Sequence, residues 1–300
     1  MPWCLNGFGG AMASITFGVV QFACSDNVDE NLAIATRLVR VAAKAGAQVV
    51  LVQELFEGLY FCQEEKAEHF ARARVLDQAH PTLRAMRELA AELGIVLPVS
   101  LFERANQVYY NSLVMVDADG SVLGLYRKSH IPDGPGYEEK FYFRAGDTGF
   151  RVWPTRFGTI GVGVCWDQWF PEAARAMALM GADVLLYPTA IGSEPASGYD
   201  SMAHWRSVMC GHAGANIMPV LAANRVGTER LGERELTFYG SSFIAGPHGE
   251  LVAEAGREGE AVLTASFDLE AIRTERAAWG LFRDRRPDLY GRLATADGQS

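Results

Sequence analysis

The 300-residue chain contains few cysteines, and those it has form no recognisable pairing or metal-binding pattern. The five stand at positions 4, 24, 62, 165 and 210, with long spacings and no Cys-x-x-Cys motif. An odd number of cysteines at such spacings indicates neither a disulfide framework nor a zinc site. We therefore expect free thiols and a reducing, cytoplasmic location.

Sequence signals of cofactors, nucleic acids and membranes are also absent. The histidines form no His-Glu-x-x-His pattern, and no glycine-rich loop ends in Gly-Lys-Ser or Gly-Lys-Thr. No apolar run approaches the roughly 18 to 20 residues that span a bilayer. A net charge of −9 argues against binding to nucleic acid or to an anionic membrane surface. We expect chemistry that uses no metal and no cofactor.

Nothing in the sequence divides the chain into separate domains. There is no Pro- or Ser-rich linker, charge block or low-complexity run, and the 49% hydrophobic content is enough for one large core. The first 25 residues carry no charged side chain, but glycines interrupt them and no basic segment precedes them. We predict a disordered extension at 1–11, natural initiation at Met12, and a single domain over 12–300.

Apolar periodicity predicts an α/β protein in which strands and helices alternate. Gly46-Ala47-Gln48-Val49-Val50-Leu51 is similar to Gly181-Ala182-Asp183-Val184-Leu185-Leu186, and each segment closes a predicted helix and opens a strand. The similarity predicts two related strand–helix–strand halves with helices on the outer faces of two sheets. Chance similarity between two buried strands is the alternative. The main predicted strands are 15–22, 48–53, 95–102, 108–116, 122–126, 158–164, 184–187, 219–224, 237–245, 250–255 and 261–267, and the helices are 28–44, 81–94, 171–180 and 200–215.

Cys165 stands where the predicted strand 158–164 gives way to a helix that begins near Pro171. A cysteine at such a junction lies close to backbone N–H groups that favour a thiolate, which is the nucleophilic form. A buried structural cysteine is the alternative. Glu54 and Lys128 end two other predicted strands, so all three side chains are candidates for the same sheet edge.

Three segments around these residues carry a resemblance to a known family. They are Gln53-Glu54-Leu55-Phe56, Tyr126-Arg127-Lys128-Ser129-His130 and Gly163-Val164-Cys165-Trp166-Asp167. In this order they resemble the signatures of the nitrilase, or carbon–nitrogen hydrolase, superfamily, and the similarity extends from about residue 15 to about residue 290. The resemblance implies a four-layer α-β-β-α sandwich of two pseudo-symmetric halves, and homo-oligomerisation.

The resemblance also implies a role for each residue. Cys165 is the nucleophile, Glu54 the general base, and Lys128 the cation that stabilises the oxyanion. A buried ion pair without catalytic use is the alternative for Glu54 and Lys128. A second active-site glutamate of the family corresponds to Glu139 rather than Glu138, because Glu139 directly precedes Lys140-Phe141-Tyr142. Two solvated loop acids are the alternative there.

Two further stretches, at 136–143 and 191–195, resemble the branch of the superfamily that hydrolyses N-carbamoylputrescine in polyamine synthesis. That resemblance implies a small cationic substrate. Glu194 is then the partner of its ammonium, and Trp166 and Tyr137 line its apolar part. Glu194 as an ordinary surface acid is the alternative.

Other functions stay open at this point. A carbamoyl-amino acid substrate, as for a β-ureidopropionase-like enzyme, needs a cation for its carboxylate, and Arg225 and Arg206 are candidates. An aliphatic amidase is a further possibility in the same superfamily. A non-catalytic binding or assembly protein is the most distant alternative, and the intact set of Glu54, Lys128 and Cys165 argues against it.

Overall fold

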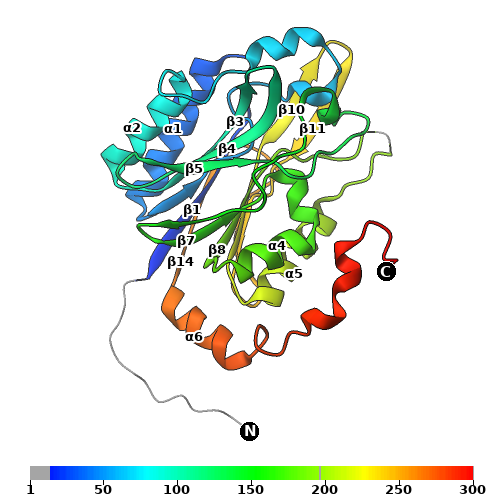
Figure 1. Ribbon diagram of the computed structural model, residues 1–300. Coiled ribbons are helices and arrows are strands. Elements are labelled where there is room, and N and C mark those ends of the chain that lie inside the picture. Colours follow the sequence, from blue (N-terminus) through cyan, green and yellow to red (C-terminus); the bar gives the residue numbers. More distant parts are fainter. Residues whose placement is uncertain (1–13, 196, 300) are drawn as a thin grey trace.

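The computed structural model describes residues 14–195 and 197–299. Two β-sheets pack face to face and helices cover their outer faces, which confirms the α-β-β-α sandwich (Figure 1). The extension at 1–11 and the start at Met12 lie outside the described residues, so they and the single domain over 12–300 stay predictions.

The first sheet combines the N-terminal half of the chain with one strand from its end. The order β14-β1-β2 continues into β3-β4-β5 through a parallel bridge between Val49 and Val96. Helices α1 and α2 cover its outer face (Figure 1). The elements are β1 (Ile15–Gln21), α1 (Val28–Lys44), β2 (Val49–Leu51), α2 (Pro81–Leu93), β3 (Leu97–Ala105), β4 (Val108–Val116), β5 (Val122–Arg127) and β14 (Ala261–Phe267).

The second sheet has the order β13-β12-β9-β8-β7-β6, with β7, β8 and β9 parallel. Helices α4 and α5 cover its outer face (Figure 1). The elements are β6 (Val152–Thr155), β7 (Gly158–Val162), α4 (Pro171–Leu179), β8 (Val184–Thr189), α5 (Met202–Asn216), β9 (Val220–Asn224), β12 (Phe243–Ala245) and β13 (Leu251–Glu254).

Each of the three spaces between the four layers holds its own hydrophobic core. Alternate strand residues point to opposite faces of a sheet, so Val49 and Leu51 enter the core between the sheets while Val50 packs toward α1 and α2. Between the second sheet and its helices, Leu185 and Tyr187 pack against Trp205 of α5. Burial on both faces explains why these strands are continuously apolar in sequence.

Local sequence sets the helix ends. The Asn27 side chain accepts hydrogen bonds from the backbone N–H groups of Asp29 and Glu30, which caps α1. Pro81 opens α2, and Gly94 ends it in the left-handed conformation at φ +67°. These boundaries agree with those that the sequence predicts.

The C-terminal half contains elements that the sequence pattern does not reveal. The predicted strand 237–245 is wrong, because it is two strands, β11 (Arg234–Tyr239) and β12, separated by Gly240 and Ser241 at positive φ. β11 pairs with β10 (Val226–Leu231) in a hairpin outside the two large sheets. Further unpredicted elements are β6, α3 (Glu139–Tyr142), α6 (Leu269–Trp279) and the short 3-10 helices η1 (Phe61–Gln63), η2 (Ala67–Arg72), η3 (Cys165–Trp169), η4 (Pro287–Leu289) and η5 (Gly291–Ala294).

The internal repeat is confirmed by matching backbone geometry in the two halves. Gly46 and Gly181 share a φ of +97°. Two residues later, the N–H of Gln48 donates to the carbonyl of Thr16 at 2.7 Å, and the N–H of Asp183 donates to that of Thr159 at 2.7 Å. The side chains of Gln48 and Asp183 accept from those same threonine N–H groups. The two halves therefore enter their sheets by the same turn.

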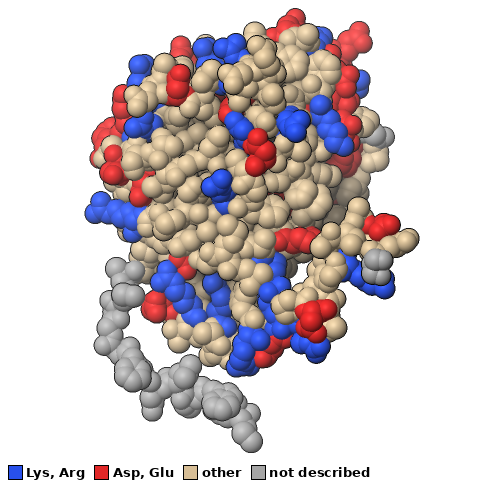
Figure 2. Space-filling model, viewed as in Figure 1, with Lys and Arg blue, Asp and Glu red and all other residues tan. Residues whose placement is uncertain are grey.

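Charges of both signs are interspersed over the face shown in Figure 2, around a broad uncharged band. Within residues 14–195 and 197–299, no helix has the length and apolarity needed to cross a membrane.

The two equivalent glycines provide a test of the repeat. No atom lies within 4 Å of a Cβ added at Gly46 or Gly181, so an alanine there meets only backbone strain. We expect Gly46→Ala and Gly181→Ala each to lower the free energy of unfolding by about 1–3 kcal/mol. Gly211→Ala, in the open interior of α5, is the control and is expected to stabilise by up to about 1 kcal/mol. Denaturant unfolding monitored by circular dichroism measures all three, and clearly unequal losses at the first two positions would contradict the equivalence.

Candidate active site

Glu54, Lys128 and Cys165 meet at one edge of the sandwich, as the sequence predicts. Each follows a strand: Glu54 comes after β2, Lys128 directly after β5, and Cys165 after β7. Glu54 and Lys128 are fully buried, and Cys165 is 6% exposed. The two facing sheets thus deliver a carboxylate, an ammonium and a thiol to the same interior space.

The Lys128 ammonium lies between two carboxylates. Its Nζ donates to Glu54 Oε1 at 3.0 Å and to Glu139 Oε2 at 2.6 Å. Burial opposes the charged form of Lys128, but Glu139 and Glu54 outweigh it and raise the lysine pKa well above its ordinary value. Lys128 is therefore a fixed cation at neutral pH.

Of the two neighbouring acids Glu138 and Glu139, it is Glu139 that contacts Lys128. Glu139 is fully buried at the start of α3 and accepts a hydrogen bond from the Tyr60 hydroxyl at 2.7 Å, whereas Glu138 is only partly buried. Burial raises the pKa of Glu139 to about 7, against the opposing effect of Lys128 and with a further increase from Glu54. Glu139 is thus a carboxyl whose charge changes near neutral pH.

The turn that carries Glu54 is held on both sides. Gln53 accepts from the Phe22 N–H at 3.1 Å and donates to the Phe22 carbonyl at 2.8 Å. Leu55 follows at a φ of +46°, a strained value for a residue with a side chain. Asn111 of β4 donates to Glu54 Oε1 at 2.7 Å, while Glu54 Oε2 has no hydrogen-bond partner among the described residues. One oxygen of Glu54 is fixed, and the other is free to accept a proton.

Cys165 also has a left-handed backbone, with a φ of +45°, in the short helix η3. Its Sγ lies 3.7 Å from the carbonyl oxygen of Ala190. Burial and Glu54 raise the pKa of the thiol well above its ordinary value, although Lys128 lowers it. The sequence-based expectation of a thiolate favoured by helix N–H groups is therefore wrong for the resting site, because desolvation and a neighbouring carboxylate dominate. The thiol must lose its proton during the reaction.

Asp167 connects the cysteine turn to the lysine segment. Its carboxylate is fully buried and accepts from the backbone N–H of Val164 at 2.9 Å, the N–H of His130 at 2.9 Å and the Tyr126 hydroxyl at 2.7 Å. Because Tyr126 and His130 flank Lys128 in the chain, this single carboxylate fixes the lysine segment relative to Cys165.

Sequence reasoning missed three residues that contact this cluster or the segments that carry it. Asn111 stands with Ser112 inside a strand that is otherwise apolar, which was an available signal of a buried polar role. Asp167 lies inside a quoted motif but had no assigned function. Tyr60 carried no signal, because its partner Glu139 is 79 residues away in the chain.

A cavity of about 110 Å³ opens over Cys165. It contains the predicted substrate-binding residues Glu194, Trp166 and Tyr137, and the Tyr137 hydroxyl accepts a hydrogen bond from the Gly192 N–H at 2.9 Å. Burial raises the pKa of Glu194. Two acids and no Lys or Arg stand among the described residues that line it, which are Pro132, Asp133, Gly134, Pro135, Tyr137, Cys165, Trp166, Trp169, Ala190, Ile191 and Glu194.

The two arginines considered for a substrate carboxylate lie elsewhere. Arg225 is fully buried and donates to backbone carbonyls and to Glu229. Arg206, on α5, pairs with Glu254 of β13. Neither lines the cavity at Cys165.

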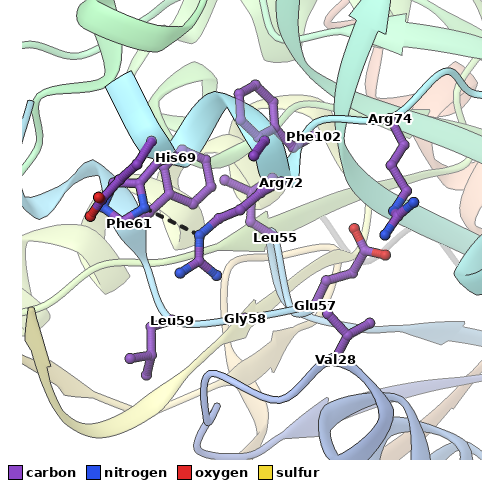
Figure 3. A pocket seen from close by; sticks show the side chains of 12 residues that line it. Val28, Leu55, Glu57, Gly58, Leu59, Phe61, His69, Arg72, Arg74 and Phe102 are labelled. Atoms are coloured by element: carbon purple, nitrogen blue, oxygen red, sulfur yellow. Dashed lines mark hydrogen bonds between the residues drawn. The ribbon is translucent and has the colours of Figure 1, made fainter. Parts of the chain in front are cut away.

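A larger cavity, of about 410 Å³, lies beside the loop that follows Glu54 (Figure 3). Leu55, Glu57 and Gly58 border it together with Arg72 and Arg74, but none of the four residues Glu54, Lys128, Glu139 and Cys165 lines it. Its size alone does not make it the reaction site, because Cys165 opens into the smaller cavity.

One group of potential metal ligands lies together in the described part of the chain. Glu64, Glu68 and His69 bring their ligand atoms within 4.8 Å of one another. The Lys66 ammonium, however, lies 2.9 Å from Glu64, and His69 lies 3.2 Å from the same carboxylate oxygen. These contacts account for the cluster as an ordinary network of charges near the surface.

Comparison with known proteins places this geometry in a family. The chain is 61% identical to the N-carbamoylputrescine amidase of Solanum tuberosum over 95% of this chain and 97% of that protein. It is 52% identical to the citrullinase of Francisella tularensis over 94% and 99% of the two chains. The crystal structure of a carbon–nitrogen hydrolase from Helicobacter pylori G27 superposes with a TM-score of 0.89 at 40% identity, covering 95% of this chain and all of the other. The carbon–nitrogen hydrolase family profile matches residues 16–277, and the chain therefore belongs to the carbon–nitrogen hydrolase family.

Proposed function

We propose that this enzyme hydrolyses N-carbamoylputrescine to putrescine, ammonia and carbon dioxide, a step of putrescine synthesis from arginine by way of agmatine. The observation that carries the substrate assignment is the cavity over Cys165, whose charged lining residues, Asp133 and Glu194, are both acids. Glu194 is partly buried and Asp133 is exposed, and an acidic lining without Lys or Arg among the described residues favours a cationic ligand. The plant relatives that carry the name of this activity support the same substrate.

In the proposed mechanism, Cys165 attacks the ureido carbon while Glu54 removes the thiol proton. The raised pKa of the resting thiol makes this proton transfer necessary. A C–S bond forms, and the carbonyl π electrons move to oxygen. Lys128 stabilises that oxyanion beside the backbone N–H of Trp166. As the tetrahedral intermediate collapses, one C–N bond breaks and its nitrogen leaves with the proton held by Glu54.

The second half of the reaction uses the same groups. Glu54 removes a proton from water, the resulting hydroxide attacks the thioester-like carbon, and the C–S bond breaks to return the thiol. The carbamic acid released then loses carbon dioxide to free the remaining amine. The products are the same whichever C–N bond breaks first.

Glu139 is proposed to hold Lys128 and the ureido group in position. Its short hydrogen bond from Lys128 Nζ means that the ammonium contacts two carboxylates, Glu139 and Glu54, at once. Removing one donor or charge of this kind typically lowers the rate on the order of 10²- to 10³-fold.

A second ureido substrate, citrulline, is favoured by the 52% identical relative named citrullinase. Citrulline carries a carboxylate next to its ammonium, and N-carbamoyl-β-alanine carries a carboxylate alone. A bound carboxylate needs a cation or several N–H donors. Arg225 and Arg206 are committed to other partners outside the cavity. The acidic lining therefore ranks N-carbamoylputrescine first.

A substrate panel tests both the reaction and this ranking. We expect ammonia release from N-carbamoylputrescine with a kcat/KM at least about tenfold above that for citrulline or N-carbamoyl-β-alanine, since a mispaired charge costs at least about 1.4 kcal/mol. Cys165→Ala is expected to remove activity on all three. Release that survives in Cys165→Ala would refute the nucleophile, and a preference for N-carbamoyl-β-alanine, which carries no ammonium, would refute the cationic subsite.

Glu194 is proposed to bind the substrate ammonium. Glu194→Gln keeps the shape of the side chain and is expected to raise KM for N-carbamoylputrescine by about 10- to 100-fold, with a smaller change in kcat, because a lost charge-assisted hydrogen bond is worth about 1.5–3 kcal/mol. The control is Glu233→Gln, an exposed acid at the β10–β11 turn that does not line the cavity. An unchanged KM in Glu194→Gln would contradict the assignment.

Glu139 gives a prediction for pH dependence. The pKa of Glu139 is about 7, so at lower pH the carboxyl is protonated and Lys128 loses one negative partner. We therefore expect kcat to fall as the pH falls through about 7. Glu139→Gln is expected to lower kcat about 10²-fold and to remove this acid limb. Glu138→Gln, its neighbour, is expected to keep both the rate and the limb. Initial rates between pH 5 and 9 measure this, and equal, mild effects at both positions would exclude a specific role for Glu139.

We also propose a homo-oligomer that works in the cytoplasm. The segment after α6 runs along the outside of the sandwich (Figure 1). Trp279 at the end of α6, and Leu289 and Leu293 after it, are 69%, 64% and 66% exposed. Apolar side chains this exposed favour contact with a second copy. A thiol nucleophile also favours a reducing compartment. Sedimentation velocity would measure the number of subunits.

A further inference from the structure

Arg225 occupies an unusual position for a fully buried cation. It directly follows β9 of the second sheet, yet its guanidinium reaches the loop that carries Glu54 from the first sheet. Nη2 donates to the backbone carbonyls of Glu54 at 2.9 Å and of Leu55 at 3.0 Å, and Nη1 donates to the carbonyl of Gly58 at 3.2 Å. One side chain therefore fixes three carbonyl groups in the loop behind the general base.

Glu229 completes this arrangement from β10. Its Oε1 accepts from Arg225 Nη1 at 2.6 Å, and its Oε2 accepts from the backbone N–H of Tyr60 at 2.6 Å. Glu229 is 3% exposed, so the pair is buried and charge-balanced. Both carboxylate oxygens are used, one for the arginine and one for the loop.

The braced loop carries two parts of the active site. Glu54 stands at its start and Tyr60 at its end, and the Tyr60 hydroxyl donates to Glu139 Oε1 at 2.7 Å. Arg225 and Glu229 thus act on both carboxylates that hold Lys128, without touching the lysine. The positive φ of Leu55 makes this loop strained, and such a conformation persists only where surrounding contacts fix it.

The residue before Arg225 performs the matching task on the other wall of the site. The Asn224 side chain accepts from the Ile191 N–H at 3.0 Å and donates to the Ile191 carbonyl at 2.9 Å. Ile191 follows Ala190, whose carbonyl lies 3.7 Å from Cys165 Sγ. Adjacent side chains at the end of β9 therefore fix the wall beside the nucleophile and the loop of the base.

We propose that the buried pair Arg225–Glu229 is a positioning device that sets the general base and the Tyr60–Glu139 arm relative to Lys128 and Cys165. This inference rests on the proposed roles of those residues. Arg225 and Glu229 do not contact the substrate. Their effect is on alignment, and displacements near 1 Å at a reacting group are sufficient to lower a rate by about 10²-fold.

Arg225→Lys is the informative substitution. A lysine keeps the charge but lacks the planar fork, so it cannot bond three carbonyls and Glu229 together. We expect kcat to fall about 10- to 100-fold with KM within about threefold of wild type. Arg273→Lys is the matched control. Arg273, on α6, also makes two hydrogen bonds to a buried carboxylate that is remote in the chain, that of Asp183. The control variant is expected to keep kcat.

A substrate-independent readout separates failure of this inference from failure of the proposed function. Alkylation of Cys165 by iodoacetamide, followed by peptide mass spectrometry, measures how readily Glu54 deprotonates the thiol. We expect a rate about tenfold lower in Arg225→Lys, at unchanged near-ultraviolet circular dichroism, and an unchanged rate in Arg273→Lys. If the wild type does not hydrolyse N-carbamoylputrescine, this comparison still decides the role of Arg225.

Glu229→Gln provides a second variant if Arg225→Lys does not fold. A glutamine keeps only one acceptor oxygen. Its NH₂ group must then face either Arg225 or the Tyr60 N–H, which are both donors, so one hydrogen bond is lost. We expect a 3- to 30-fold fall in kcat that is strongly non-additive with Tyr60→Phe, since both changes act through the same arm. A near-wild-type kcat and alkylation rate in both variants would overturn the proposal. Losses of activity that only follow the loss of folded protein would overturn it too. Additive effects of Glu229→Gln and Tyr60→Phe on kcat would exclude the route through Tyr60.

Discussion

The rest of the site depends on one buried ammonium, that of Lys128, shared between two carboxylates. A lone buried cation is strongly disfavoured, and a lone buried carboxylate equally so. Glu54, Lys128 and Glu139 form a cluster in which two carboxylates stabilise one ammonium, so one negative charge is in excess. That excess falls on Glu139, whose pKa rises to about 7, and it disfavours a thiolate at Cys165.

This balance explains why the surroundings of Cys165 favour the protonated thiol over the thiolate. A third negative charge in the same space would have to be desolvated beside two carboxylates, with only one ammonium to offset it. An uncharged ureido group adds no charge when it binds, and its oxygen gains negative charge only as the C–S bond forms. In the proposed mechanism Lys128 interacts most strongly where this charge develops, and such an interaction lowers the reaction barrier rather than tightening ground-state binding.

The strand ends and the residues on them were predictable, because apolar runs locate strands and each of Glu54, Lys128 and Cys165 follows one. The β10–β11 hairpin was not, since Glu229, Arg230 and Glu235 give it the polarity of a loop. Arg225 was read as available for a substrate because its partners are remote: the carbonyl of Glu54 lies 171 positions away. Contacts across such separations come from the fold, and no local pattern encodes them.

The two halves of the chain enter their sheets by the same turn, yet they supply different chemistry. The first half provides the carboxylate of the proposed base, the ammonium and Asp133 of the cavity lining, and the second half provides the thiol and Glu194. Because the site combines groups from both halves, contacts between the halves are needed to hold these groups in position. Asp167 makes one such contact, from the cysteine turn to the lysine segment, and Arg225 makes the other, from β9 to the loop of the base. Both contacts include hydrogen bonds to backbone groups, so they fix the positions of whole segments. The side chains on those segments are positioned as a result.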